Sequence, residues 1–273
     1  MFFRTLKLEL HIHRTRLIFL IVGAAFLSLI SCLSFFNVLY LQSLPESRIL
    51  PSFWDQLAHA YEGTPPFVAD REVPFQIPIV YFIQHLLLLL TLGGTTECYF
   101  EPYGYEIFTR IPKRGLWWYA HSAFCLIASV LYCLTAVTVT AIFCLASGAD
   151  FSLSSYSGLS LPGVISWPGP GSIQIFTLFL TPLFVWSALG MLLQAIELLF
   201  GSLPAFLALV CLIVAGAFLD TPLLFANHTI LLRSCSFLGS GTTLFQTFGI
   251  CLGVIALSLV TGLVVLSHKD MLV

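Results

Sequence analysis

The residues best suited to chemistry in this chain lie between Glu97 and Tyr119, where six of its 24 charged side chains (11 basic, 13 acidic) occur among aromatic residues. The first half of this stretch holds the side chains that we expect to contact a partner, Glu101, Tyr103, Tyr105, Glu106, Phe108 and Arg110. Aromatic anchors within a charged rim are typical of a protein-docking surface. The chemistry that these residue types predict is therefore recognition of another protein.

Local sequence rules predict a short helix over 102–110. Pro102 suits the first turn of a helix, and Glu106 and Arg110 are an i, i+4 pair with the acid first, the stabilising order. Pro112 disfavours helix at the residue before it and so ends the segment. This helix would expose more aromatic and apolar surface than a solvated loop needs, through Tyr103, Tyr105, Ile107 and Phe108.

The second half of the stretch has a simpler explanation. Lys113 and Arg114 are placed to anchor the inner leaflet, and Trp117 and Trp118 would form an aromatic belt where a span begins. An ordinary inner loop that obeys the positive-inside rule accounts for these residues. It does not account for the aromatic helix before them, so the docking hypothesis rests on that helix.

The composition of the whole chain is that of an integral membrane protein. Hydrophobic residues make up 58% of the sequence and charged residues 9%, with a mean hydropathy of +0.98, whereas average proteins carry about 25% charged residues. A membrane helix needs ~20 apolar residues, so 273 residues can hold six crossings and short loops in a single transmembrane domain, 1–273. No polar block remains for a soluble catalytic domain.

Apolar runs define the expected all-α fold. They place six transmembrane helices at about 17–41, 76–96, 116–146, 173–200, 204–219 and 245–266. One alternative concerns the first run, because Leu29 to Cys32 fits a lipoprotein cleavage site after a basic leader. Cleavage signals are followed by polar mature sequence, whereas here the apolar run continues, which favours a true span.

Residues 2–14 predict an amphipathic helix that lies in the membrane interface. Apolar residues recur at helical spacing, at Phe3, Leu6 and Leu10. A basic stripe one residue on is formed by Arg4, Lys7, His11 and Arg14. Such a stripe suits a surface of anionic lipid. The alternative is a solvated basic leader that only orients the first span.

Two outer segments carry local signals. Ser52 and Asp55 form a capping-box pattern and Gly63 is placed to stop a helix. This pattern predicts a short amphipathic helix over 53–62. The segment 220–245 is apolar but interrupted by polar residues, so we expect short re-entrant or interfacial helices there, covered by protein.

Three polar residues lie within or beside the spans. We expect His85 to bond a neighbouring helix rather than to line a route, His121 to lie in the interface, and Glu197 to reach water from the end of its span. A carboxylate at the bilayer centre would cost ~2.5–3.5 kcal/mol. The eight cysteines show no metal-ligand spacing, and no metal site is expected.

Basic residues orient the chain. With the N-terminus in the cytoplasm, eight of them lie on the inner side: Arg4, Lys7, Arg14, Arg16, Arg110, Lys113, Arg114 and Lys269. Three lie on the outer side: Arg48, Arg71 and Arg233. Because cytoplasmic loops carry the excess of Lys and Arg, we expect both termini and the stretch 97–119 in the cytoplasm.

Several function classes are disfavoured by missing motifs. The sequence has no Gly-rich phosphate loop ending in Lys-Ser/Thr, no HExxH and no GxSxG. It also has no acidic pair in the middle of a span, which proton-coupled transport often requires. Basic residues are too few and scattered for a nucleic-acid face. We therefore expect no enzyme activity in this chain.

In layout and in one motif, the chain resembles the bacterial ABC-2-type permeases, the membrane subunits of ABC exporters whose ATPase is a separate polypeptide. The layout includes the interfacial N-terminal helix, six spans and the cytoplasmic loop between spans two and three. The motif runs from Arg110 to Trp118, RIPKRGLWW. It is similar to the Arg…Arg/Lys-Lys-x-Trp-Trp signature of many small permeases of this type. Ile111 and Pro112 depart from it, since polar residues are commoner there.

The resemblance implies a coupling helix at about 101–111 that sits in a cytoplasmic ABC ATPase and transmits its closure to the spans. It implies as contacts Tyr103, Glu106, Phe108 and Arg110, with Glu101 and Tyr105 beside them. ATP and Mg would be bound by the ATPase, and this chain would hold no cofactor. A second copy or a related permease would complete the route in a bacterial plasma membrane, with a peptide or lipid-like cargo.

Two readings from other classes stay open at this point. One is an ATPase-independent membrane carrier or an immunity or scaffold protein. The other is an enzyme that acts on lipid, which would need a polar cluster at interface depth. An ATPase gene beside this one would favour the exporter, whereas a proton-dependent flux without such a gene would favour the carrier.

Overall fold

A computed structural model describes residues 1–42, 52–67, 77–100, 113–149, 151, 172–235 and 241–268. Within these ranges the chain is all-helical, apart from an isolated bridge between Ser234 and Thr242. The longer helices are α1 (Phe2–Ile12), α2 (Arg14–Gln42), α3 (Phe53–Ala60), α4 (Ile79–Leu92), α6 (Arg114–Ser147), α7 (Ser172–Phe200), α8 (Ser202–Phe218) and α9 (Leu244–His268). Three short 3-10 helices are η1 (Glu97–Tyr99), η2 (Phe225–Thr229) and η3 (Leu231–Arg233).

Five helical segments in the described ranges are long and apolar enough to cross a membrane. They are Arg14–Asn37, Ile79–Tyr99, Arg114–Ser147, Thr177–Phe200 and Leu244–His268. The expected span at 204–219 is also helical, as α8, but its 17 residues cover only about 26 Å at 1.5 Å per residue. The hydrocarbon core is ~30 Å thick. The chain is therefore a multi-pass helical membrane protein in which α8 is shorter than the other apolar helices.

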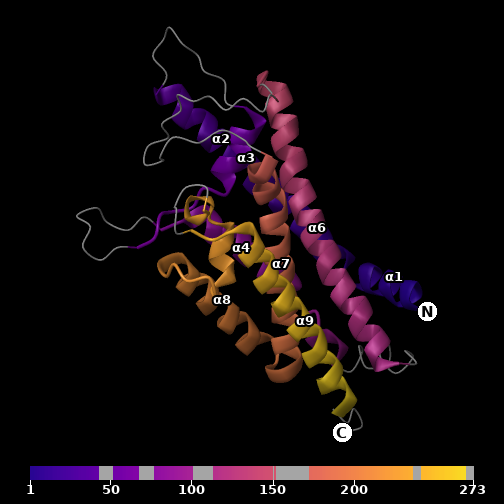
Figure 1. Cartoon of the computed structure of the whole chain (residues 1–273). Helices are drawn as coiled ribbons and strands as arrows, with labels where there is room; N and C mark the ends of the chain where they lie inside the picture. The colour runs from indigo at the N-terminus through magenta and orange to yellow at the C-terminus, as the bar shows by residue number, and fades with distance from the viewer. Residues whose placement is uncertain are drawn as a thin grey trace.

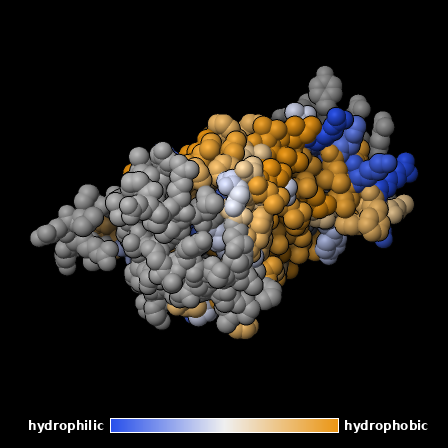
Figure 2. All heavy atoms as spheres, turned by 90° about the horizontal axis from the view of Figure 1, so that it is seen from above, coloured by the Kyte–Doolittle hydropathy of each residue, from blue (hydrophilic) through white to orange (hydrophobic). Residues whose placement is uncertain are grey.

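The outer surface of the bundle fits contact with lipid. Large apolar side chains point outward on three helices, for example Phe26 at 63% exposure, Ile142 at 60% and Leu257 at 64%. Figure 2 shows a continuous hydrophobic band across the face seen from above, with the strongly hydrophilic residues gathered at one edge. Apolar patches of this extent are not stable in water.

Helix α7 is the centre of the bundle. Of its most apolar 18-residue window, 67% is buried, against 22% for α6 and for α9. It contacts α4, α6, α8 and α9, and Figure 1 shows it between these helices. Gly190 permits this closeness, since a Cβ there would overlap both Cys125 of α6 and Leu92 of α4.

The segments around α3, η2 and η3 pack against the end of the bundle opposite the chain termini. The predicted capping box is confirmed: the Asp55 N–H donates to Ser52 Oγ at 3.2 Å, and the Ser52 N–H donates to Asp55 at 2.9 Å. Gly63 has a positive φ of 67° beside Ile230, so the chain turns there toward η2. The expectation of short, protein-covered helices in 220–245 is confirmed by η2 and η3, whose residues are buried.

Arg233 is fully buried in this outer layer, although the sequence counted it only as an outer charge. Its guanidinium donates to the Gly216 carbonyl at 2.7 Å and to the Ala217 carbonyl at 2.5 Å, and its Nε donates to Thr64 at 3.2 Å. The Gly216 and Ala217 carbonyls belong to the last turn of α8, where the helix dipole favours a cation. Arg233 therefore binds the C-terminal end of α8.

The expected basic stripe is exposed, with Arg4, Lys7 and His11 on α1 and Arg14 at the start of α2. The inward face of α1 differs from the expectation. Thr5 and Glu9 are buried, Leu6 and Leu10 pack against the core, and Phe3 is 81% exposed. The buried face is thus rotated by about one residue and includes a carboxylate, because α1 packs on α6. Figure 1 shows α1 beside the lower half of α6.

Both termini lie toward the same end of the bundle (Figure 1). The starts of α2, α6 and α8 meet the ends of α4, α7 and α9 at this end, which we call the terminal end. It carries six of the seven described Lys and Arg residues: Arg4, Lys7, Arg14, Arg16, Lys113 and Arg114. Their gathering at one end is the asymmetry on which the predicted orientation depends.

Candidate functional site

The candidate site is the base of the loop between α4 and α6, at the terminal end. The residues expected to contact a partner, Glu101, Tyr103, Tyr105, Glu106, Phe108 and Arg110, lie outside the described residues, as does the predicted helix 102–110. The structure describes the two stems of that loop. One is the segment 93–100 after α4, which we call the elbow, and the other is the start of α6 at Lys113.

The elbow is a turn that begins with two glycines. Gly94 has a positive φ of 72°, which glycine adopts without strain. The backbone then continues through Thr95 and Thr96 into η1. Such a turn leaves backbone N–H and C=O groups without helical partners, and these groups must be satisfied where they are buried. Two charged side chains from other helices, Glu197 and Arg16, supply partners.

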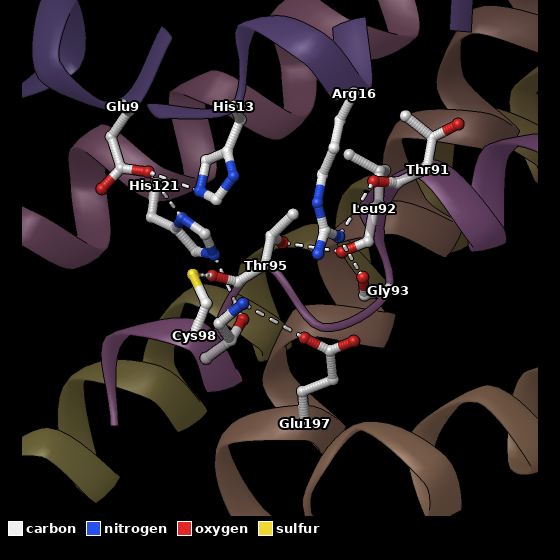
Figure 3. Close-up of polar contacts among 11 residues, drawn as sticks. Glu9, His13, Arg16, Thr91, Leu92, Gly93, Thr95, Cys98, His121 and Glu197 are labelled. Carbon is white, nitrogen blue, oxygen red and sulfur yellow. Dashed lines mark hydrogen bonds and ion pairs between the residues drawn. The ribbon is translucent and has the colours of Figure 1, made fainter. Parts of the chain in front are cut away.

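Glu197 of α7 is the first of these. Its carboxylate accepts hydrogen bonds from the Gly94 N–H at 2.7 Å and from the Thr96 N–H at 3.3 Å. The expectation that Glu197 reaches water is wrong, because its side chain is 4% exposed and is turned into the elbow. Figure 3 shows this carboxylate beneath the turn. The acid is thus a support for the elbow rather than a surface group.

Arg16 of α2 binds the same turn from the other side. Its guanidinium donates to the carbonyls of Gly93 and Thr91, the latter at 3.4 Å (Figure 3). These are carbonyls at the end of α4, where a cation is favoured. The sequence analysis predicted only that Arg16 is one of the basic residues on the cytoplasmic side.

Glu97 connects η1 to the hairpin between α7 and α8. Its carboxylate accepts from the Ser202 N–H, the first residue of α8, at 3.1 Å. An acid at a helix N-terminus is stabilising. Gly201, with φ of 89°, makes the sharp turn that brings this N-terminus close.

The second stem is held by a cluster of large side chains, which we call the tryptophan cluster: Tyr99, Trp117, Trp118, Leu198 and Leu266. Its members come from η1, α6, α7 and α9. Trp118 donates its Nε1–H to the Leu259 carbonyl at 3.1 Å and lies against Gly262, where a Cβ would overlap its ring. The cluster joins both stems to the ends of α7 and α9.

The predicted membrane anchors of this region divide into two groups. Lys113 and Arg114 are exposed, as membrane anchoring requires. Trp117 and Trp118 are 0% exposed and lie inside the protein, whereas Tyr119 is 48% exposed. The two tryptophans therefore pack helices together, because α9 and η1 cover the face of α6 on which they lie.

His121 also differs from the expectation of an interfacial residue. Its ring is 0% exposed, with Nε2 at 3.1 Å from Thr96 Oγ1 and Nδ1 at 3.0 Å from Glu9 Oε2. This pair of contacts joins the elbow to α6 and α1 (Figure 3). Sequence reasoning missed Glu9, and the available signal was that Glu9 is the only acid among the first 45 residues.

His85 lies elsewhere and has a packing role. Its Nδ1 is 2.7 Å from the Tyr81 carbonyl, one turn earlier in α4, and its ring packs near Trp186 of α7. Its hydrogen bond is therefore to its own helix and not to the neighbouring helix that the sequence predicted. A cavity of about 220 Å³ opens nearby, between the start of α4 and the segment after α3. Its lining includes His59, Glu62, Tyr81 and Gln84.

Comparisons with models of known protein families, with curated proteins and with solved structures find no match for this chain. The class of protein is thus defined by its own features, a multi-pass helical membrane protein with a braced loop base at the terminal end.

Proposed function

We propose that this chain is the transmembrane permease subunit of an ATP-driven exporter that works with a separate cytoplasmic ATPase. The loop 101–112 docks in the ATPase, which binds ATP and Mg. A second copy of the chain, or a related permease, completes the translocation route. The proposed cargo is a peptide or lipid-like molecule, and the proposed location is a bacterial plasma membrane.

One observation carries the proposal: the stems of this loop are braced to every long helix of the terminal end. The elbow binds α7 through Glu197, α2 through Arg16 and α8 through Glu97. Thr96 contacts His121 of α6, and the tryptophan cluster adds α9. A loop that only connects two spans needs no such bracing.

The bracing gives a mechanism for coupling. A displacement of the docked loop would be passed to α4 and α6 directly and to α7 through the buried carboxylate of Glu197. Because α7 is the most buried helix, its displacement would change the packing of the whole bundle. Packed helices shift between discrete arrangements rather than deforming continuously. ATPase closure could in this way open or close a route between the spans.

The first experiment tests docking. Glu106→Ala combined with Arg110→Ala is expected to abolish pull-down of the co-expressed ATPase and its stimulated hydrolysis, because the charged rim of the docking helix is lost. Arg71→Ala with Glu72→Ala serves as the matched control, since it removes the same charges from the predicted outer side. Unchanged pull-down and hydrolysis in the first double variant would refute the docking role.

A carrier without an ATPase is the second candidate, and the outer cavity favours it. That cavity is lined by His59 and Glu62, whose side chains are 2.9 Å apart, so it offers a titratable pair to a small polar substrate. In that case flux would depend on the proton gradient, and Glu62→Gln would abolish it while depletion of cellular ATP would not. An ATPase gene next to this one would argue for the exporter.

A further inference from the structure

Three side chains of the metal-ligating types meet where α1, α2 and α6 join. Glu9 lies in the last turn of α1, His13 lies between α1 and α2, and His121 lies two turns into α6. They are 1%, 3% and 0% exposed, respectively. Figure 3 shows the carboxylate and the two imidazoles turned toward one another. The proposed docking function uses none of the three as a ligand.

The distances among these groups suit a common ion. Glu9 Oε2 lies 3.0 Å from His121 Nδ1 and 3.6 Å from His13 Nε2. One ligand atom from each residue lies within 4.8 Å of the others. Ligand atoms bound at 2.0–2.1 Å to a tetrahedral ion are about 3.3 Å apart. Small side-chain rotations are therefore enough to bring all three atoms onto one ion.

His13 is the group whose position calls for a ligand. Among the described residues its Nε2 finds no hydrogen-bond partner, although the side chain is buried. A bound ion or water would give this buried nitrogen the partner that it lacks.

The surroundings of His121 orient it for coordination. Its Nε2 is 3.1 Å from Thr96 Oγ1. In the tautomer whose Nε2–H donates to Thr96, Nδ1 keeps its lone pair directed at Glu9 and His13. Metal-binding histidines almost always make such a hydrogen bond with the other ring nitrogen. The rings of Trp117 and Phe124 stack on His121 and exclude water from its faces.

We propose that Glu9, His13 and His121 bind one Zn²⁺ ion, with a fourth position open to water. Two imidazoles and one carboxylate are a donor set that zinc takes in proteins, whereas Mg²⁺ and Ca²⁺ prefer oxygen ligands alone. The ion would fasten α1 to α6 beside Thr96 of the elbow. This inference is independent of the proposed ATPase, because it depends only on groups within the chain.

The test uses the full-length protein purified in detergent and stripped of metal with a chelator. Titration with ZnCl₂ against a chromogenic competitor is expected to give one bound Zn²⁺ per chain. The thermal unfolding midpoint should rise with Zn²⁺ concentration, as for any ligand of the native state. MgCl₂ at the same concentrations should leave the midpoint unchanged.

Substitutions of the three proposed ligands test where the Zn²⁺ ion binds. His13→Gln and His121→Gln are expected to weaken Zn²⁺ binding by at least ~10-fold, since even a lost outer-shell partner costs that much. His11→Gln is the matched control, because His11 is exposed on the same helix and should leave binding unchanged. Glu9→Gln, which keeps the shape of the side chain, provides a further variant if either histidine change prevents folding.

Three results would overturn the proposal, and the first two come from the variants. One is the same Zn²⁺ affinity in the parent protein and in the Glu9 and His13 variants, which would mean that these side chains form only a hydrogen-bonded network. The other is loss of binding in His11→Gln, which would mean that zinc binds on the surface. A Co²⁺-loaded protein without the visible absorption of a low-coordinate ion would contradict the proposed geometry, even if every variant failed to fold.

Discussion

At the scale of single residues, the terminal end is held by side chains that satisfy buried backbone groups. Glu197, Arg16 and Glu97 each bind backbone atoms of a different helix end or turn. Each contact joins residues far apart in the chain, for example 103 positions in the case of Glu197 and Gly94. No local pattern in the sequence predicts such a pair, which is why Glu197 was expected to face water.

The role of Glu197 can be measured by thermal unfolding in detergent. Glu197→Ala is expected to destabilise the protein by ~1–3 kcal/mol, because it leaves the buried N–H groups of Gly94 and Thr96 without an acceptor. Glu197→Gln keeps one acceptor oxygen and should cost less. Glu62→Ala, at a partly exposed site, is the control. Equal unfolding midpoints in Glu197→Ala and the control would contradict the support role.

A second residue-scale prediction concerns pH. Burial lowers the pKa of His228 below its ordinary 6.5, while its contact with the Pro222 carbonyl and the nearby Asp220 oppose the shift. The unfolded chain therefore binds a proton below pH 6.5 that the folded chain does not. Stability from this group is complete above about pH 6.5 and is lost as pH falls below it.

Unfolding midpoints measured between pH 8 and pH 5.5 test this sign. The parent protein should lose stability over the lower half of the range, and His228→Gln should lose less. The relevant quantity is the difference between the two proteins, since other groups titrate equally in both. A difference that does not change with pH would show that His228 is not the titrating group.

At the scale of elements, local sequence patterns predicted individual helices but not how the helices pack together. Hydropathy located the apolar helices, and the capping box located α3, because both patterns repeat within a few residues. The elbow and the tryptophan cluster depend on which helices meet, and a single sequence does not carry that information. Trp117 and Trp118 therefore suggested a lipid interface but lie between helices.

The packing of α6 on α9 gives a matched pair of substitutions. Gly262→Ala places a methyl group where the Trp118 ring lies, so we expect a loss of ~1–3 kcal/mol from overpacking. Gly253→Ala, in the same helix, meets open space and should stabilise by roughly 0.5–1 kcal/mol. Thermal unfolding of the two variants in detergent gives the comparison. If Gly262→Ala were no less stable than Gly253→Ala, the close packing of Trp118 on Gly262 would be contradicted.

At the scale of the whole molecule, the prediction of orientation can be tested directly. The termini lie toward one end with most of the described basic residues, and this end is predicted to be cytoplasmic. A green fluorescent protein fused after Lys269 should therefore fluoresce, and alkaline phosphatase fused there should be inactive. Active phosphatase would indicate the opposite orientation, in which the loop 101–112 is out of reach of a cytoplasmic ATPase.

The contact between Arg233 and the end of α8 also bears on the order of biosynthesis. Helix α8 covers only about 26 Å, and its terminal carbonyls are bound by a guanidinium that is synthesised 15 residues after Phe218. During translation α8 therefore emerges from the ribosome before Arg233 does. Its insertion should remain reversible until η2 and η3 follow, so the outer layer is completed by the chain's last third.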